Sequence, residues 1–171
     1  MSNIKKNKIA ICCDLNSKTG LGHINRMKSL ANEFNKKKLL SFFLFNDLKK
    51  NLKLNLLKNY NLIIDSKKKV SSHKNIFDLI IKKKFKIVLI DSYIFSQRLE
   101  KKLVENKIFT IVIDDHLKER FANLVFSNRT DVLNCIAPKK NQKWLYGNKY
   151  VLIEKKQKKN KKKKIPQNIS R

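Results

Sequence analysis

Short, continuous apolar runs alternate with longer amphipathic segments along this chain. The runs are residues 9–13 (IAICC), 39–45 (LLSFFLF), 62–64 (LII), 87–90 (IVLI), 109–113 (FTIVI) and 124–126 (LVF). Runs of this kind, rich in β-branched residues and without polar alternation, are typical of strands buried on both faces of a parallel sheet. Parallel neighbours require long crossover connections, so this pattern restricts the fold more than any other feature.

The segments between the runs have helical periodicity. Residues 24–35 place Met27, Leu30 and Phe34 on one face, and residues 74–84 and 96–106 repeat the pattern. Strands that alternate with such helices predict an α/β fold with a doubly wound parallel sheet and right-handed crossovers. Trp144 and Tyr146 are expected to pack the last segment onto that sheet.

At 171 residues the chain is long enough for one ordinary domain. We expect this domain at residues 1–153, followed at 154–171 by a lysine-rich tail or interdomain linker. The net charge is +28, and eight lysines fall in residues 155–164 (KKQKKNKKKK). The remaining lysines are scattered and no aromatic stripe accompanies them, so compositional bias explains them better than a nucleic-acid partner. A basic RNA-associated protein is the weaker alternative.

The three cysteines are Cys12, Cys13 and Cys135. Their spacing gives neither a disulfide framework nor a metal site, so reduced thiols and a cytoplasmic location are expected. We find no apolar run long enough for a membrane span and no secretory leader.

The stretch 13–31 (CDLNSKTGLGHINRMKSLA) connects the first predicted strand to the first predicted helix. In open α/β sheets, ligands bind where strands end, and glycines such as Gly20 and Gly22 let a ligand approach the backbone closely. The helix N-terminus that follows suits an anion. The pattern lacks the third glycine of the dinucleotide fingerprint, and no Gly-Lys-Ser/Thr of a P-loop follows.

His23 falls in the first turn of this helix, where the helix dipole lowers the pKa of an imidazole and favours its neutral, base-competent form. A turn with an incidental histidine is the simpler interpretation. Arg26, one turn further on, could orient a phosphate or carboxylate, or bridge to Asp14. Asp114-Asp115-His116 follows a strand, where loop and capping carboxylates are common, so we expect no metal there.

These residues carry a resemblance. The stretch 13–34 resembles the N-terminal motif of the UDP-sugar hydrolases of pseudaminic acid biosynthesis, the PseG/SpsG family, which reads R-x-D-x-S-x-x-I-G-x-G-H-x-x-R-x-x-x-L-A. The segments VLIDSYIFSQRLEKKL, TIVIDDHLKERFANLVFSNRT and YGNKYVLIEKK resemble later parts of the same family in order and spacing. The resemblance covers residues 7–156. The matching positions of the first block are Asp14, Gly20, Gly22, His23, Arg26, Leu30 and Ala31.

The resemblance implies a Rossmann-like domain, the N-terminal half of a two-domain GT-B fold. It implies hydrolysis of UDP-2,4-diacetamido-2,4,6-trideoxy-β-L-altropyranose to UDP and free sugar, without a cofactor. His23 would be the base that activates water at the anomeric carbon. The residues that would contact substrate are Asp14, Ser17, Gly20, Gly22, Arg26, Tyr93 and, near the crevice, Asp115.

Two departures from the family pattern matter. Cys12 stands where the family has an arginine, and the chain stops at Arg171, about where the family's UDP-binding second domain begins. A separately encoded C-terminal UDP-binding domain is therefore the expected partner. A natural split half, a fragment and a decayed copy all stay open. A non-catalytic sugar-nucleotide-binding or assembly subunit is the alternative function.

Overall fold

Seven strands form a single parallel sheet in the computed structural model, which describes residues 7–13, 22–45, 57–64, 73–93, 97–132 and 136–150. The strand order is β3-β2-β1-β4-β5-β6-β7, and every neighbouring pair is parallel. The bounds are β1 (Lys8–Cys13), β2 (Leu40–Phe45), β3 (Asn61–Ile64), β4 (Ile87–Asp91), β5 (Phe109–Ile113), β6 (Leu124–Ser127) and β7 (Lys143–Tyr146).

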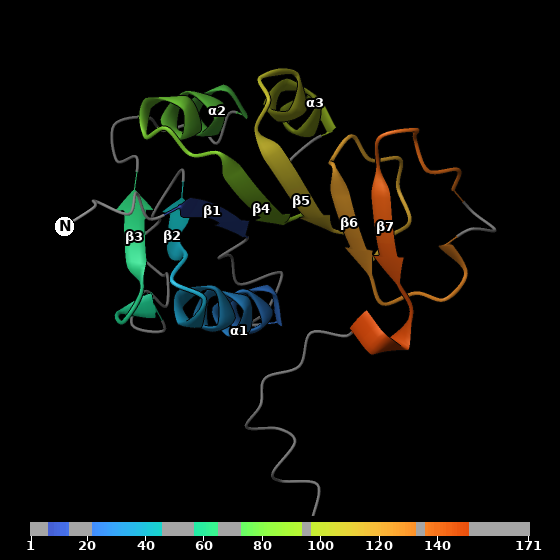
Figure 1. Ribbon diagram of the computed structural model, residues 1–171, viewed down its shortest axis with the longest axis horizontal. Helices are drawn as coiled ribbons and strands as arrows, with labels where there is room; N and C mark the ends of the chain where they lie inside the picture. Colours follow the sequence, from blue (N-terminus) through green and yellow to red (C-terminus); the bar gives the residue numbers. More distant parts are fainter. Residues whose placement is uncertain are drawn as a thin grey trace, which may run out of the picture.

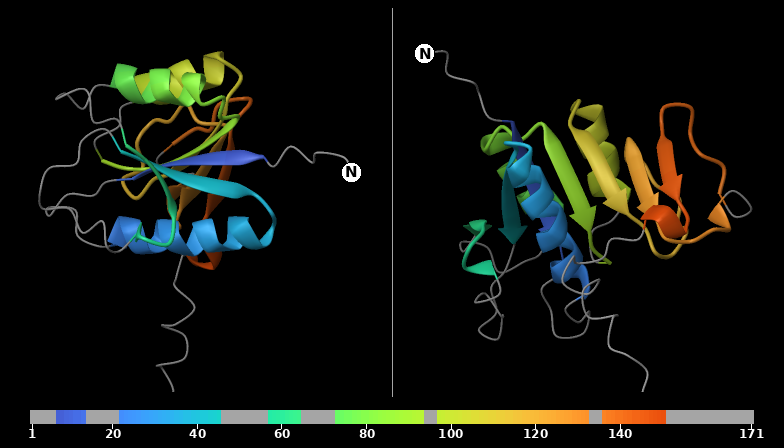
Figure 2. Two further views of the ribbon diagram at one scale, coloured as in Figure 1. Left: turned by 90° about the vertical axis from the view of Figure 1, so that its left-hand side faces the viewer. Right: turned by 60° about the horizontal axis from the view of Figure 1, so that its bottom comes forward.

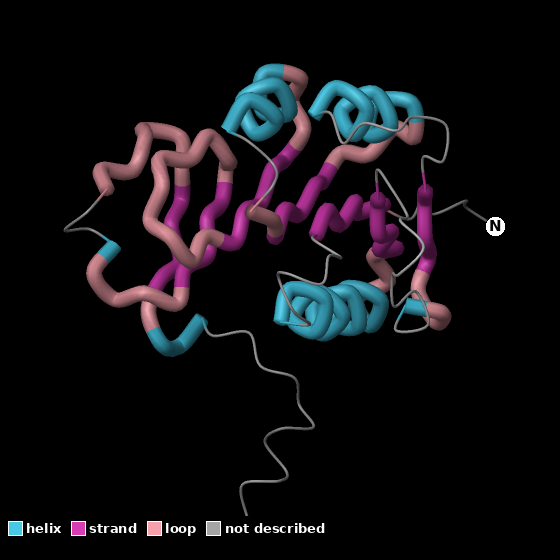
Figure 3. The backbone as a smooth tube through the Cα atoms, turned by 180° about the vertical axis from the view of Figure 1, so that it is seen from behind, coloured by secondary structure: helices cyan, strands magenta, loops and turns pink. Residues whose placement is uncertain are grey.

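Helices cover both faces of the sheet. The helix α1 (Gly22–Lys36) lies on one face, and α2 (His73–Lys82) and α3 (Gln97–Glu105) lie on the other (Figures 1 and 2). The view from behind in Figure 3 shows the same three layers. A short 3-10 turn, η2 (Asn148–Tyr150), follows β7. The predicted Rossmann-like, doubly wound class is therefore confirmed.

Each central strand contributes side chains to two separate cores. Ile9, Ile11 and Cys13 of β1 belong to the core beneath α1, whereas Ala10 and Cys12 belong to the core beneath α2 and α3. Successive side chains of a strand point to opposite faces, so a strand covered on both sides must be apolar throughout. This explains the unbroken apolar runs in the sequence. It also places Cys12 on the face opposite α1, where burial raises the pKa of its thiol to about 12.

The last strand, β7, was not expected. Trp144 and Tyr146 do not merely pack the segment onto the sheet; they lie within a strand that pairs with β6, with Trp144 opposite Val125. The Trp144 indole is buried, and its Nε1–H donates to Gln142 at 2.7 Å. A four-residue strand that begins with lysine has too short an apolar run to be recognised from periodicity.

Parts of the expected organisation fall outside the described residues. These are the boundary at residue 153, the tail at 154–171 and Cys135. In the described ranges, no helix combines the length and apolar character that crossing a bilayer requires.

The three helices end in the same way, with a lysine in the left-handed backbone region. The φ angles are 61° at Lys38, 57° at Lys84 and 57° at Lys107. After each lysine, an apolar residue donates its N–H to a carbonyl in the last helical turn, as Ile108 does to Leu103 at 3.0 Å. This arrangement is a Schellman cap, in which glycine normally occupies the left-handed position. The chain has only 3 glycines, and lysine takes this position at a steric cost.

We expect Lys107→Gly to raise the free energy of unfolding by about 0.5–1 kcal/mol, because glycine adopts positive φ without a Cβ clash. Lys101→Gly, in the exposed interior of the same helix, should lower it by about 1 kcal/mol. Urea denaturation of both variants measures the difference. Destabilisation by Lys107→Gly would contradict the cap.

Candidate active site

The site lies where the connections of the sheet diverge. The chain leaves β1 through α1 towards β2 on one side, and leaves β4 through α3 towards β5 on the other, although β1 and β4 are neighbours. A crevice forms at the carboxyl ends of two such strands, and open α/β sheets bind ligands there. His23 in the first turn of α1 and Asp91 at the end of β4 meet at this point.

His23 and Asp91 form a buried pair. His23 is 5% exposed and Asp91 is 0% exposed, and the distance from His23 Nδ1 to Asp91 Oδ1 is 2.6 Å. Asp91 has the same parity as Leu89, which packs beneath α1, so its carboxylate points to the α1 face. A carboxylate at this distance requires a proton on Nδ1. Asp91 therefore fixes the ring orientation and leaves Nε2 as the nitrogen through which His23 would exchange protons.

Arg26 holds the same carboxylate from the other side. Its Nε donates to Asp91 Oδ2 and its Nη2 to Asp91 Oδ1, both at 2.5 Å, while Nη1 donates to Asp115 Oδ2 at 2.8 Å. Two parallel bonds to one carboxylate are the strongest arrangement that a guanidinium makes. Burial alone would lower the pKa of Arg26, but its bonds and charge interactions with Asp91 and Asp115 outweigh burial and raise the pKa above its ordinary value.

Tyr93 forms the outer wall of the site. Its ring packs edge-on against the His23 ring with centroids 4.6 Å apart, and it also contacts the His116 ring, with centroids 4.8 Å apart. Tyr93 is 52% exposed, although it is a large aromatic residue. It therefore presents a surface to the crevice while it covers the histidine.

The adjacent carboxylates Asp114 and Asp115 have separate roles. Asp115 faces Arg26, whereas Asp114 is fully buried and accepts a hydrogen bond from Arg120 Nη2 at 3.0 Å. Arg120 also bonds to Glu100 of α3 at 2.8 Å. Asp114 further accepts the N–H groups of His116 and Lys118, which holds the loop after β5 in place. Asp114 is thus a structural residue, and its loop presents Asp115 to the site.

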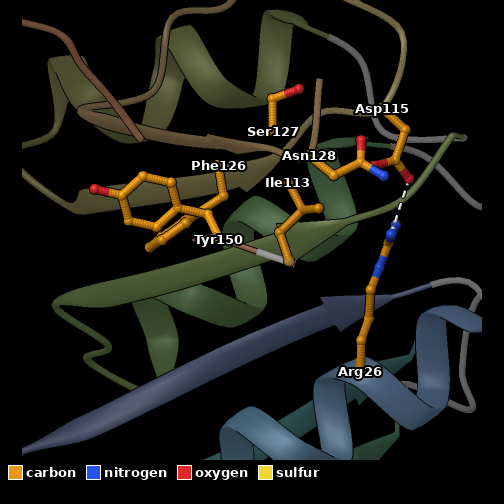
Figure 4. A pocket seen from close by; sticks show the side chains of 7 residues that line it. All are labelled: Arg26, Ile113, Asp115, Phe126, Ser127, Asn128 and Tyr150. Carbon is orange, nitrogen blue, oxygen red and sulfur yellow. Dashed lines mark hydrogen bonds and ion pairs between the residues drawn. The ribbon is translucent and has the colours of Figure 1, made fainter. Parts of the chain in front are cut away.

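A pocket adjoins the Arg26–Asp115 pair (Figure 4). Arg26 reaches across from α1 to its rim, and the other walls come from the ends of β5 and β6 and from η2. The walls combine aromatic, hydroxyl, amide and charged groups; they are Arg26, Ile113, Asp115, Phe126, Ser127, Asn128 and Tyr150. No group of three or more His, Cys, Asp or Glu side chains in the described ranges is placed to hold a metal ion.

Four of the residues singled out from the sequence come together here, namely His23, Arg26, Tyr93 and Asp115. Among the described residues, Arg26 binds Asp91 and Asp115, which the sequence analysis did not name as its partners; the alternative of a bridge to Asp14 lies outside the described residues.

The remaining predicted positions lie in or beside the loop after β1. Gly22 begins α1 without a positive φ, and a Cβ there would meet no atom within 4 Å among the described residues. Asp14, Ser17 and Gly20 lie outside the described residues.

Asp91 is the residue of the candidate site that the sequence analysis missed. In the motif Asp91-Ser92-Tyr93, only the tyrosine was interpreted as a site residue, and the aspartate was interpreted as the end of a strand. An acidic residue that directly continues an apolar run, in the strand paired with β1, was an available indication. The pocket residues Asn128 and Tyr150 lie in two segments already quoted for the family resemblance, TIVIDDHLKERFANLVFSNRT and YGNKYVLIEKK, but only the fold shows that they line one pocket.

No protein-family model matches the chain, and no curated protein matches it by sequence. Among solved structures, MurG from Acinetobacter baumannii is similar to it, with a TM-score of 0.56 and 13% identical residues. The similarity covers 83% of this chain and 45% of the MurG chain, so the chain spans less than half the length of MurG. At this identity the similarity shows a shared fold.

We expect neutral His23 to carry its proton on Nδ1, because Asp91 accepts it. A long-range ¹H–¹⁵N spectrum of imidazole-labelled protein distinguishes the two tautomers, with the exposed His116 as internal reference. Asp91→Asn should shift His23 towards the Nε2–H form. An Nε2–H form in the unmodified protein would contradict the assignment.

Arg120→Ala should lower the free energy of unfolding by about 3 kcal/mol, because it leaves the buried carboxylates of Asp114 and Glu100 without their counter-charge. Lys36→Ala, which removes an exposed pair with Glu33, should cost about 0.5 kcal/mol or less. Chemical denaturation compares the two. Equal costs would mean that the Arg120 network does not stabilise the loop.

Proposed function

We propose that this chain is the sugar-side, base-carrying half of a UDP-sugar hydrolase of the PseG/SpsG kind. The observation that carries the proposal is His23, buried at the divergence of β1 and β4 and bonded through Nδ1 to Asp91. A histidine oriented by a carboxylate is a recurring general base. The fold shared with MurG, a GT-B protein, and the coverage of less than half of that chain support a GT-B half.

The reaction needs a base and little else from this half. His23 Nε2 takes a proton from water as the water oxygen bonds to the anomeric carbon, and the bond from that carbon to the UDP oxygen breaks. The electron pair of the broken bond leaves with UDP, which is stable as an anion. A positioned base supplies roughly 10²–10⁴-fold of rate in such steps.

The pocket beside Arg26 suits the sugar of the proposed substrate, UDP-2,4-diacetamido-2,4,6-trideoxy-β-L-altropyranose. The rings of Phe126 and Tyr150 provide an apolar wall for C–H groups and methyl groups, and Asn128 and Asp115 provide hydrogen-bonding groups for amide and hydroxyl substituents. Tyr93, exposed beside His23, would cover the sugar at its reacting carbon.

The UDP group would be bound by a second, C-terminal half outside these 171 residues. Arg26 is a less suitable phosphate ligand, because three of its five N–H groups already donate to Asp91 and Asp115 and neutralise its charge. We further propose a cytoplasmic location, which the buried thiol of Cys12 supports.

His23→Ala should lower UDP release by about 10²–10⁴-fold. The assay combines the full chain with the UDP-binding half of a PseG/SpsG hydrolase and the altropyranose nucleotide, and ³¹P NMR follows UDP. Lys36→Ala, at the opposite end of α1, is the matched control and should keep full activity.

Unchanged turnover in His23→Ala would refute the role of His23. If saturation-transfer NMR shows that the unmodified pair binds the nucleotide sugar, and the pair releases no UDP, the non-catalytic binding subunit is favoured instead.

A further inference from the structure

Arg26 connects three groups of the site at once. Nε and Nη2 grip both oxygens of Asp91, Nη1 bonds to Asp115, and Nη2 also lies 3.2 Å from His23 Nδ1. Since Nδ1 carries a proton that points to Asp91, the last contact places two donors side by side. Arg26 therefore repels additional positive charge on the His23 ring.

The charge of Asp91 acts in the opposite direction. A carboxylate 2.6 Å from Nδ1 stabilises an imidazolium and would make His23 a poor base near neutral pH. Arg26 offsets this effect, because the same carboxylate already receives two charge-assisted bonds from the guanidinium. Asp91 can then orient the ring without holding a second proton on it.

Asp115 moderates Arg26 in turn. Its Oδ2 accepts a hydrogen bond from the third nitrogen of the guanidinium, on the side of the pocket (Figure 4). The negative charge of Asp115 partly neutralises Arg26. Asp115 is only partly buried, with 24% of its side chain exposed, so a ligand in the pocket can reach it. How strongly the positive charge of Arg26 acts on Asp91 and His23 therefore depends on the charge of Asp115.

Three elements bring charged or titratable groups to the described surroundings of His23. Asp91 faces the ring from β4, Arg26 from α1, and the phenol of Tyr93 from the segment after β4; His116 lies behind Tyr93. The positive end of α1 adds to the effect of Arg26.

We propose that Arg26 is a positioning residue that lowers the proton affinity of His23 through Asp91. Through Arg26, the charge of Asp115 also affects the proton affinity of His23. The inference rests on the proposed function for its meaning, since a base must be unprotonated to act. Its geometry does not depend on the identity of the sugar.

The test is a pH titration of the His23 ring by ¹⁵N NMR in the full chain. Arg26→Gln should raise the pKa of His23 by about 1–2 units, because Asp91 then acts on the ring without a counter-charge. Arg26→Lys, which keeps the charge but cannot grip both oxygens, should raise it less. Asp115→Asn should lower it, because Arg26 is then neutralised only by Asp91. Lys36→Ala is the control and should leave it unchanged.

The opposite signs separate this role from a structural one. If Arg26 merely held the fold, Arg26→Gln and Asp115→Asn would both move His23 towards the ordinary histidine pKa of about 6.5 and weaken the Nδ1–H tautomer. That result, or no shift in either variant, would overturn the proposal. Because the readout is His23 itself, a failure here and an absence of UDP-sugar hydrolysis are distinguishable.

Discussion

Asp91 is a carboxylate at the end of a central strand with no access to water, and burial of such a charge is tolerated only when it is paired and hydrogen-bonded. His23 and Arg26 both satisfy it, and both come from the first two turns of α1. The electrostatic requirement of one residue therefore fixes how the N-terminal end of α1 sits against β4. The geometry of the proposed base and the stability of this corner of the fold have the same origin.

The alternation of side chains along the strands determines which charges can meet. Asp91 shares the parity of Leu89, and Asp115 that of Ile113, and all four face α1. Asp114 lies between and turns to the opposite face, where Arg120 and Glu100 bind it. The two adjacent aspartates therefore lie on opposite faces of the sheet. Asp114 stabilises the structure on the face of α2 and α3, and Asp115 belongs to the candidate site on the face of α1.

Much of the fold and part of the candidate site could be predicted from the sequence. Strands buried on both faces leave unbroken apolar runs, and His23, Arg26 and Tyr93 lie in motifs that the sequence analysis singled out. The six predicted strands and three predicted helices are present, with ends that differ by at most two residues. What could not be predicted depends on tertiary context. β7 is too short for periodicity, and three lysines occupy helix caps where glycine is the usual indication. The partners of Arg26 lie 65 and 89 residues away.

The contacts of the candidate site depend on one another, because they share one positive charge, that of Arg26. Arg26 has three donor nitrogens, and two carboxylates use all of them. A hydrogen-bond donor that a ligand brings to Asp115 would withdraw charge from that carboxylate and leave Arg26 bound more strongly to Asp91. Asp91 would then stabilise a protonated His23 less. In the proposed mechanism, occupation of the pocket and protonation of the proposed base, His23, would therefore be linked by charge, without any movement of the backbone.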